Sequence, residues 1–337
     1  MQNMQYNLES FAYELIPKMT RKNQFCSAIA INQNNKIVIV EERGKIKVFN
    51  LSNEALKLIQ IIQLFGYSIN TINFFKQQQF IVIASCMGDI IFRSSILQSN
   101  QKFLMKIKDN ITSINCLLLN SPQEDLIITG SNDYAIRFYQ SKQLSSMCWK
   151  CSQTITEHLN KVQGLSLNQE GTKLISCGSD LKIIIMEGSN KNKWIVKQKI
   201  QTESIGFRIN FITNDTFIFQ EKSYYLLSYY IFNSKQGQFY RYRKFQVEGS
   251  QQSCYNLFPA IYLNQKQLLL LKNGKYLNLI RFINSPSGSQ DFEFTLIQTI
   301  HFDTGQIFGT LSEDGQFLIT WDHNSYEIQV RKPKKIV

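Results

Sequence analysis

Three residues in the middle of the chain are of the types that a serine hydrolase uses. His158, Ser176 and Asp180 could in principle supply the base, the nucleophile and the orienting acid of acyl transfer. A nucleophilic serine, however, needs an exposed position on a strained turn such as G-x-S-x-G, with donors beside it for the oxyanion. Ser176 stands within I-S-C-G, in the middle of an apolar run. We therefore expect these side chains to have a structural role, and we expect no catalytic residue.

A second pattern, C-W-K-C at Cys148 to Cys151, has the spacing of a zinc or thiol redox motif. No second pair stands at ligand spacing, and residues three apart on a strand point to opposite faces. No glycine-rich phosphate loop leads from a strand into a helix, and the chain has only 3 histidines. We expect neither a metal nor a cofactor.

Residues 224–245 combine many aromatic side chains with several basic ones. Aromatic rings can stack on bases while basic groups contact phosphates, so the segment is a candidate nucleic-acid patch. The same composition suits two β-strands that carry basic residues on an exposed edge, which is the interpretation we favour. The candidate patch comprises Tyr240, Arg241, Tyr242, Arg243 and Lys244.

The elements that must position these residues are short strands. Residues 128–140 read I-T-G-S-N-D-Y-A-I-R-F-Y-Q, and residues 175–187 read I-S-C-G-S-D-L-K-I-I-I-M-E. Each is a strand, a tight Ser/Asp turn and a second strand, and fainter copies occupy residues 37–50, 80–94 and 317–332. Alternation of apolar and polar residues dominates the chain, which predicts an all-β array of one small unit.

Seven polar turns recur at intervals of roughly 42 to 50 residues, close to the length of a four-stranded propeller blade. Such a sheet cannot cover both of its apolar faces, so it stacks on its neighbours until the array closes into a ring. We predict a seven-bladed β-propeller of four-stranded antiparallel blades that forms a single domain over residues 1–337. The turns lie at residues 34–35, 76–77, 122–123, 170–171, 214–215, 264–265 and 314–315.

The two ends of the chain are expected to meet. The last predicted strand, at residues 326–331, leaves the seventh blade without an outer strand, and residues 11–16 precede the first strand of blade one. We therefore predict that residues 1–20 supply the closing strand by pairing with the last blade. Residues 331–337 are predicted to be a basic tail, which resembles a short nuclear-import signal.

These repeats resemble the WD-repeat family of β-propellers. In the best match, His158 takes the family's His position, Ser176 and Asp180 take theirs, and M-E at residues 186–187 replaces Trp-Asp. The resemblance implies that the three side chains form a buried hydrogen-bond relay, and it gives Thr129 and Asp133 the same role in blade three, where Ile107 replaces the His. It also implies a partner-docking face, which we map onto Arg43, Asn132, Tyr134, Lys161 and His323.

Composition narrows the function classes further. The net charge of +12 attracts anionic partners but does not choose among them. Seven cysteines, the lack of a secretory signal and the lack of a membrane-length apolar run favour a cytoplasmic protein, with the nucleus as the alternative. We expect a non-enzymatic scaffold that binds one or more proteins within a larger complex. The alternative is an RNA- or ribonucleoprotein-binding propeller that uses its basic surface.

Overall fold

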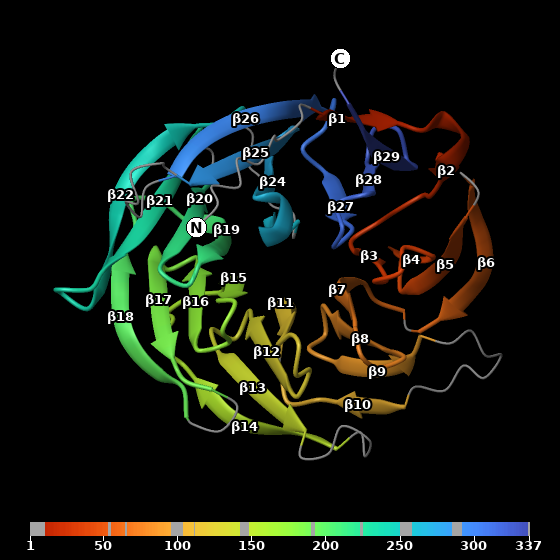
Figure 1. Ribbon diagram of the computed structural model, residues 1–337. Helices are drawn as coiled ribbons and strands as arrows, with labels where there is room; N and C mark the ends of the chain where they lie inside the picture. The colour runs from red at the N-terminus through yellow and green to blue at the C-terminus, as the bar shows by residue number, and fades with distance from the viewer. Residues whose placement is uncertain are drawn as a thin grey trace.

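The computed structural model has seven antiparallel sheets arranged as blades around a common axis (Figure 1). Apart from two short 3-10 turns, η1 (Pro17–Met19) and η3 (Asn264–Lys266), the described residues contain no helix. The prediction of an all-β propeller with seven blades is confirmed. The structure describes residues 11–52, 55–64, 66–95, 104–110, 112–141, 148–189, 193–222, 225–249, 258–284 and 292–335, so residues 1–10 of the predicted closing segment and 336–337 of the predicted tail lie outside it.

Each blade runs from an inner strand beside the axis, through two middle strands, to an outer strand at the rim. Blade one comprises β3 (Ile29–Ile31), β4 (Ile37–Glu42), β5 (Lys45–Ser52) and β6 (Ala55–Gln63). Blade two comprises β7 (Ile69–Phe74), β8 (Phe80–Ser85), β9 (Ile90–Ser94) and β10 (Met105–Ile107). Blade three comprises β11 (Ile114–Leu119), β12 (Leu126–Ser131), β13 (Ile136–Ser141) and β14 (Trp149–Ile155).

The second half of the chain repeats this plan. Blade four comprises β15 (Val162–Leu167), β16 (Lys173–Gly178), β17 (Lys182–Glu187) and β18 (Ile195–Gln201). Blade five comprises β19 (Gly206–Thr213), β20 (Thr216–Glu221), β21 (Leu226–Asn233) and β22 (Gln238–Gln246). Blade six comprises β23 (Ile261–Leu263), β24 (Leu268–Asn273), β25 (Tyr276–Asn284) and β26 (Phe292–His301), and blade seven comprises β27 (Ile307–Leu311), β28 (Leu318–Asp322), β29 (Glu327–Lys335) and the N-terminal strands β1 (Phe11–Leu15) and β2 (Arg21–Lys22).

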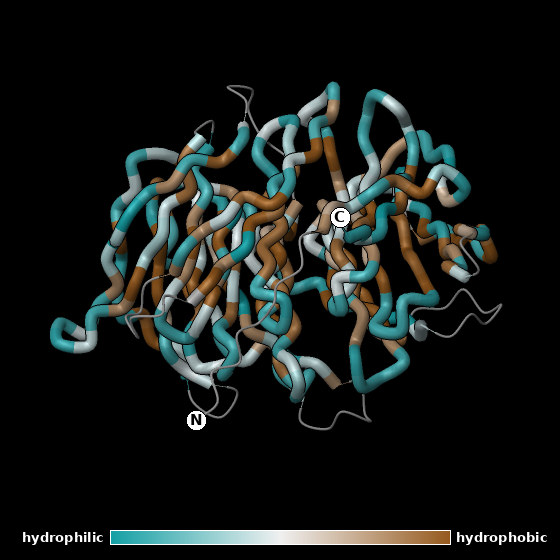
Figure 2. Tube along the Cα trace, turned by 45° about the horizontal axis from the view of Figure 1, so that its top comes forward, coloured by the Kyte–Doolittle hydropathy of each residue, from teal (hydrophilic) through white to brown (hydrophobic). Residues whose placement is uncertain are grey.

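The hydrophobic core lies between the blades. Apolar side chains of two neighbouring sheets meet in each cluster, as where Phe138 of blade three stacks on Trp194 beside blade four with ring centroids 5.4 Å apart. Figure 2 shows apolar strands within the ring and hydrophilic turns at its two faces. Because burial of apolar surface is the main favourable term in folding, each blade depends on its neighbours for stability.

Side-chain amides link the inner strands of successive blades. The carboxamide of Asn70 donates to the carbonyl of Ile114 at 2.8 Å, and that of Asn115 donates to the carbonyl of Val162 at 2.9 Å. These bonds satisfy main-chain carbonyls beside the axis, where a missing partner would be unfavourable. The wealth of Asn in this chain therefore has a structural use at the inner strands.

Glutamines link the outer strands in the same way. Each side chain donates its amide NH₂ to a main-chain carbonyl of the next blade and accepts the N–H of the same residue, so that it imitates a step of β-pairing. We call this arrangement a glutamine clamp. The clamps join Gln153 to Trp194, Gln198 to Phe239 and Gln298 to Tyr13, with N···O distances from 2.7 to 3.2 Å.

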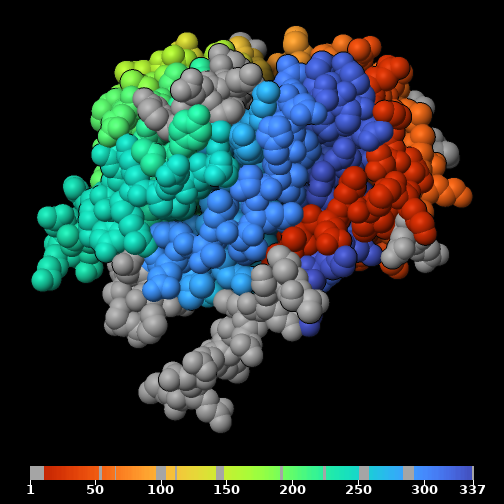
Figure 3. Space-filling model, turned by 90° about the horizontal axis from the view of Figure 1, so that it is seen from above, coloured from red at the N-terminus to blue at the C-terminus, as the bar shows by residue number. Residues whose placement is uncertain are grey.

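The N-terminal residues close the ring. Strand β1 pairs antiparallel with the second half of β29, from Phe11 opposite Lys335 to Leu15 opposite Arg331. Tyr13 is 2% exposed, and its hydroxyl donates to the carbonyl of Gly315 at 2.7 Å. Figure 3 shows the red N-terminal residues lying against the blue final blade. The predicted pairing of the N-terminal strand with the last blade is confirmed.

Two details of this closure differ from the prediction. The closing segment continues past residue 20, because β2 pairs with Glu327 and Ile328 at the start of β29. Residues 331–335, predicted as a tail, are instead the second half of β29. Lys334 there pairs with Glu14 at 3.0 Å. A lysine-rich sequence can form this strand because it lies near the rim, where its ammonium groups reach water while its main chain pairs with β1.

Candidate functional site

The turns between the second and third strands and the loops that lead into each inner strand lie at the same end of every blade. Main-chain bonds join the two at several blades, as where Asn132 N–H donates to Ser113 at 2.8 Å and Ser179 N–H donates to Lys161 at 2.8 Å. We call this end of the ring the upper face.

The three residues of hydrolase type meet beneath the upper face in blade four. Nδ1 of His158 lies 2.9 Å from a carboxylate oxygen of Asp180, and its Nε2 lies 2.8 Å from Oγ of Ser176. A carboxylate can only accept, so Nδ1 donates its hydrogen to Asp180 and Nε2 accepts the hydroxyl hydrogen of Ser176. Asp180 also accepts the N–H of Leu159 at 2.9 Å. The network ties the turn at residues 179–181 to the entry loop of the blade.

Burial decides against catalysis by this network. The side chain of Ser176 is wholly buried, so no substrate carbonyl could approach its oxygen. Burial also lowers the pKa of His158, although the hydrogen bond to Asp180 opposes the change. Gly178 completes the packing, because a Cβ there would lie 2.5 Å from Oδ1 of Asp180 and 2.6 Å from Nδ1 of His158. The three side chains therefore hold the turn at residues 179–181 against the entry loop of the blade, and we call such a network a lock.

Blade three uses other residues for the same purpose. Asp133 forms an ion pair with Arg137 at 2.8 Å, and Arg137 donates to Oδ1 of Asn110 at 3.0 Å. Burial opposes ionisation of Asp133, but its bonds to Arg137 hold its pKa below the usual value. Thr129 belongs to no such relay, since its buried hydroxyl has no hydrogen-bond partner among the described residues. Its predicted role is wrong, because the blade lacks the histidine that the hydroxyl would have met.

Asn110 and a third lock in blade two were missed by sequence reasoning. Asn110 lies in the entry loop three residues after Ile107, where a search for histidine finds nothing. In blade two, Asp89 accepts a hydrogen bond from Tyr67 and pairs with Lys106 at 2.8 Å. The available signal was the aspartate that follows the second strand in blades two, three and four.

The tips of the turns expose large side chains on the upper face. Tyr134 and Tyr326 adopt left-handed backbone conformations, with φ of 71° and 54°, and their rings are exposed. Leu159, next to the lock histidine, is 71% exposed, and Met87 in blade two is 60% exposed. Isolated exposed apolar residues are ordinary, but these four large side chains share one end of the ring, where the turns are braced.

The five predicted docking residues all belong to this face, though not all are free. Arg43, Tyr134, Lys161 and His323 are exposed. Asn132 is half-buried, and its side-chain oxygen accepts a hydrogen bond at 2.8 Å from Asn115, the residue that links blade three to blade four. The sequence did not point to Met87, Leu159 or Tyr326, since nothing in their immediate neighbours marks them as exposed.

The basic residues of the candidate nucleic-acid patch are already paired. Arg241 lies 2.7 Å from Glu203, and Lys244 lies 2.9 Å from the same carboxylate. Arg243 donates to the main-chain carbonyl of Phe292, and its guanidinium lies over the ring of Phe294 at 4.6 Å. Tyr240 and Tyr242 are exposed on outer strand β22. The structure places the five residues together. Arg241 and Lys244 are paired with a carboxylate, however, and Arg243 joins blade five to blade six.

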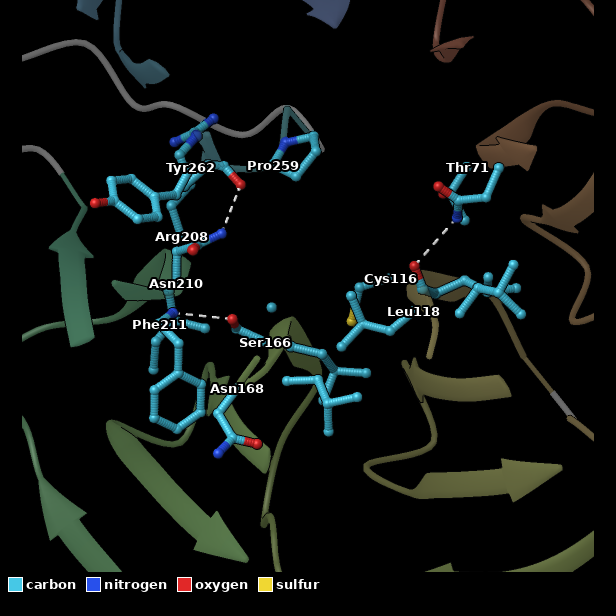
Figure 4. Close-up of a pocket in the computed structure, with 18 of the residues that line it drawn as sticks. Thr71, Cys116, Leu118, Ser166, Asn168, Arg208, Asn210, Phe211, Pro259 and Tyr262 are labelled. Atoms are coloured by element: carbon cyan, nitrogen blue, oxygen red, sulfur yellow. Dashed lines mark hydrogen bonds between the residues drawn. The ribbon is translucent and has the colours of Figure 1, made fainter. Parts of the chain in front are cut away.

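A cavity of about 540 Å³ opens beside the axis, among the inner strands of blades two to six. Figure 4 shows its lining, where Ser166 accepts the N–H of Phe211. Arg208, the one charged residue in the lining, is buried and donates through Nε to the carbonyl of Phe258 at 2.7 Å. The lining mixes apolar and uncharged polar side chains around Arg208, and several of its donors join blades to one another, so it carries no sign of a particular ligand.

The remaining chemistry of the chain is sparse. Cys148 and Cys151 are exposed free thiols on or beside the outer strand β14. In the described part of the chain, no three His, Cys, Asp or Glu side chains gather as a metal ion would require. The same residues include no helix with the length and apolar character to span a bilayer.

Comparison with known proteins agrees with the geometry. The family model "WD domain, G-beta repeat" matches residues 149–185, which run from β14 into β17 and contain the lock residues of blade four. A chain in the solved structure "Crystal Structure of Mitotic Checkpoint Complex" is similar over 98% of this chain and 94% of its own, with a TM-score of 0.70 and 15% sequence identity. No curated protein matches the sequence.

The fold and the locked turns define a seven-bladed propeller. One repeat of this ring, at residues 149–185, matches the WD-repeat family model, in the part of the chain where the resemblance was predicted to be best.

Proposed function

We propose that this chain is a non-enzymatic scaffold whose upper face binds a protein partner within a multi-subunit complex. The observation that carries the proposal is the set of exposed side chains on braced turns. Tyr134 is the clearest member, because Asp133 and Arg137 hold its turn on one side and Asn132 holds it on the other. A side chain that is already positioned loses little conformational entropy on binding, which favours affinity.

The chemistry of this face suits a partner with apolar and acidic groups. Leu159 and Met87 offer apolar contact, while Tyr134 and Tyr326 combine a ring with a hydroxyl. Aromatic residues are enriched among those that dominate binding energy at interfaces. Arg43 and Lys161 add exposed positive charge at the same end of the ring. An acidic peptide or protein surface with aliphatic residues fits this combination.

RNA binding remains the weaker alternative. The side chains offered for it, Arg241 and Lys244, both pair with Glu203, and Lys244 also lies 3.7 Å from Glu221, so few free cations accompany the exposed tyrosines of β22. Among the described residues, the groups of hydrolase type that meet are those of the buried network in blade four. A cytoplasmic location, with the nucleus as the alternative, stays a prediction from the composition.

Affinity purification of the tagged full-length chain from its own cells, followed by mass spectrometry, tests the proposal. Tyr134→Ala and Leu159→Asp should remove a reproducible set of proteins that the unmodified chain retains. Leu296→Asp is the matched control, since Leu296 is also exposed but lies on the outer strand β26. Retention of every partner by both upper-face variants, or loss of the same set in the control, would contradict the proposal.

A further inference from the structure

The outer strand of blade one exposes a different surface from the other outer strands. Gln60 of β6 pairs with Val48 at a β-bulge, and Gln198 of β18 pairs with Ile185 at the equivalent bulge. The two registers can therefore be superposed on these glutamines. Ile59 and Ile61 of β6 then correspond to Lys197 and Lys199 of β18.

The same superposition extends to three more blades, whose bulges lie at Gln153, Arg243 and Gln298. Of these five blades, blade one alone has exposed aliphatic residues at both positions, with Ile59 40% and Ile61 51% exposed and Leu58 beside them at 43%. The corresponding pairs are Ser152 and Thr154 in blade three, Tyr242 and Lys244 in blade five, and Ile297 and Thr299 in blade six.

Gln60 is also the exception among the clamp residues. Its counterparts Gln153, Gln198 and Gln298 each hold the main chain of the next blade on both sides of the carboxamide. Oε1 of Gln60 is buried and has no hydrogen-bond partner among the described residues. Among the described residues, Gln60 therefore does not form the two-sided clamp seen between blades three and four, four and five, and six and seven.

An edge strand with this character is open to pairing. Among the described strands, β6 pairs only with β5, so the main-chain groups along its other edge have no strand partner. Figure 1 shows β6 at the outer rim of the ring. Proteins usually protect such edges with lysine or other charged side chains, as β18 does with Lys197 and Lys199. Blade one has aliphatic side chains where that protection would be.

We propose that β6 is a second docking site, where an extended segment of a protein partner adds to blade one as a fifth strand. In this mode main-chain hydrogen bonds hold the segment, and alternate side chains contact Ile59 and Ile61. The charges around β6 indicate which kind of segment would bind there. β6 contains no acidic residue, Lys57 and Lys45 are exposed at its two ends, and the whole chain carries +12. The segment is therefore aliphatic at alternate positions and acidic at its ends, whereas a second copy of this chain is repelled.

A synthetic peptide tests the site without knowledge of the natural partner. The probe is fluorescein-labelled Glu-Asp-Val-Thr-Val-Thr-Ile-Asp-Glu, titrated with the full-length chain and followed by fluorescence anisotropy. A second probe carries N-methyl groups on alternate residues, so that one edge of it cannot donate hydrogen bonds. Binding of the first probe and at least tenfold weaker binding of the second are expected if pairing of main chains holds the segment.

Two substitutions locate the site. Ile61→Lys places on β6 the residue found at the corresponding position of β18, and it should weaken binding of the probe about tenfold or more. Ile61→Thr, the residue type of blades three and six at this position, should weaken it less while keeping the strand's β propensity. Ile195→Lys on β18 is the control, because Ile195 is 58% exposed on another outer strand.

Several results would contradict the proposed site on β6. Absence of binding, equal binding of the N-methylated probe, or full binding by the Ile61→Lys variant would overturn the proposal. A dimer of the chain in light scattering that Ile61→Lys abolishes would also overturn it, since the occupant would then be a second copy. The upper-face variants Tyr134→Ala and Leu159→Asp should bind the probe normally, so this test is independent of the proposed function.

Discussion

Ring closure by the N-terminal strand makes Tyr13 one of the most sensitive positions in the chain. Its ring is packed with Phe258, Leu268 and Leu318 between blades six and seven, and its hydroxyl donates to Gly315. Tyr13→Ala removes a buried ring, which typically lowers the free energy of unfolding by about 3–5 kcal/mol. The lost hydrogen bond contributes about 1 kcal/mol of further destabilisation.

The shift in melting temperature follows from the size of the protein. At about 2.1 cal/mol/K per residue, a chain of 337 residues has an unfolding entropy near 0.7 kcal/mol/K. A loss of about 4–6 kcal/mol therefore lowers the melting temperature by about 6–8 °C. Tyr13→Phe, which keeps the ring and removes only the hydroxyl, should lower it by about 1–2 °C.

Urea unfolding followed by tryptophan fluorescence is a suitable assay, because Trp321 lies beside the closure and donates to the carbonyl of Asn23 at 2.7 Å. Tyr240→Ala is the control, as this tyrosine is exposed on β22 and its loss should change stability by less than about 0.5 kcal/mol. Equal unfolding midpoints for Tyr13→Ala and Tyr240→Ala would refute the reasoning. So would a chain lacking residues 1–20 that unfolds at the same urea concentration as the full chain.

Two further predictions concern the lock and the clamps. The pKa of His158 is lowered from its usual value near 6.5. As pH falls below that value, the unfolded chain therefore binds more protons than the folded one. The contribution of the lock to stability is then lost in acid. His158→Gln should therefore lower the free energy of unfolding more at pH 8 than at pH 5.5, and a difference that grows on acidification would mean that a charged imidazole pairs with Asp180. Gln198→Ala removes both bonds to the main chain of Phe239 and should lower the free energy of unfolding by about 1–3 kcal/mol in the same urea assay. Gln201→Ala, at an exposed position of the same strand, should be nearly neutral. Equal effects of the two substitutions would mean that the clamp adds nothing to stability.

The rhythm of turns was enough to predict the propeller, because strand and turn patterns are local and repeat along the chain. The lock in blade four was predicted from the resemblance to WD repeats, whose pattern His158, Ser176 and Asp180 follow within one blade. Thr129 shows the limit of that reasoning. Its position matched the pattern, but its function depended on a histidine that the entry loop lacks.

Contacts between residues far apart in the chain could not be read from the sequence. Glu203 meets Arg241 across 38 positions of the chain, and nothing near either residue marks the pair. The candidate nucleic-acid patch was therefore predicted from Arg241 and its neighbours without the carboxylate that neutralises it. The glutamine clamps were missed in the same way, since a chain rich in glutamine gives Gln153 and Gln198 no local distinction.

The most direct test of the docking account is a photo-crosslink from the upper face in cells. A benzophenone amino acid placed at Tyr134 should form covalent adducts with one or a few proteins, and the same residue placed at Tyr240 on the outer strand of blade five should not form them. Adducts that are identical from the two positions, or none from position 134 when position 240 forms them, would contradict the claim that braced turns on the upper face hold the partner.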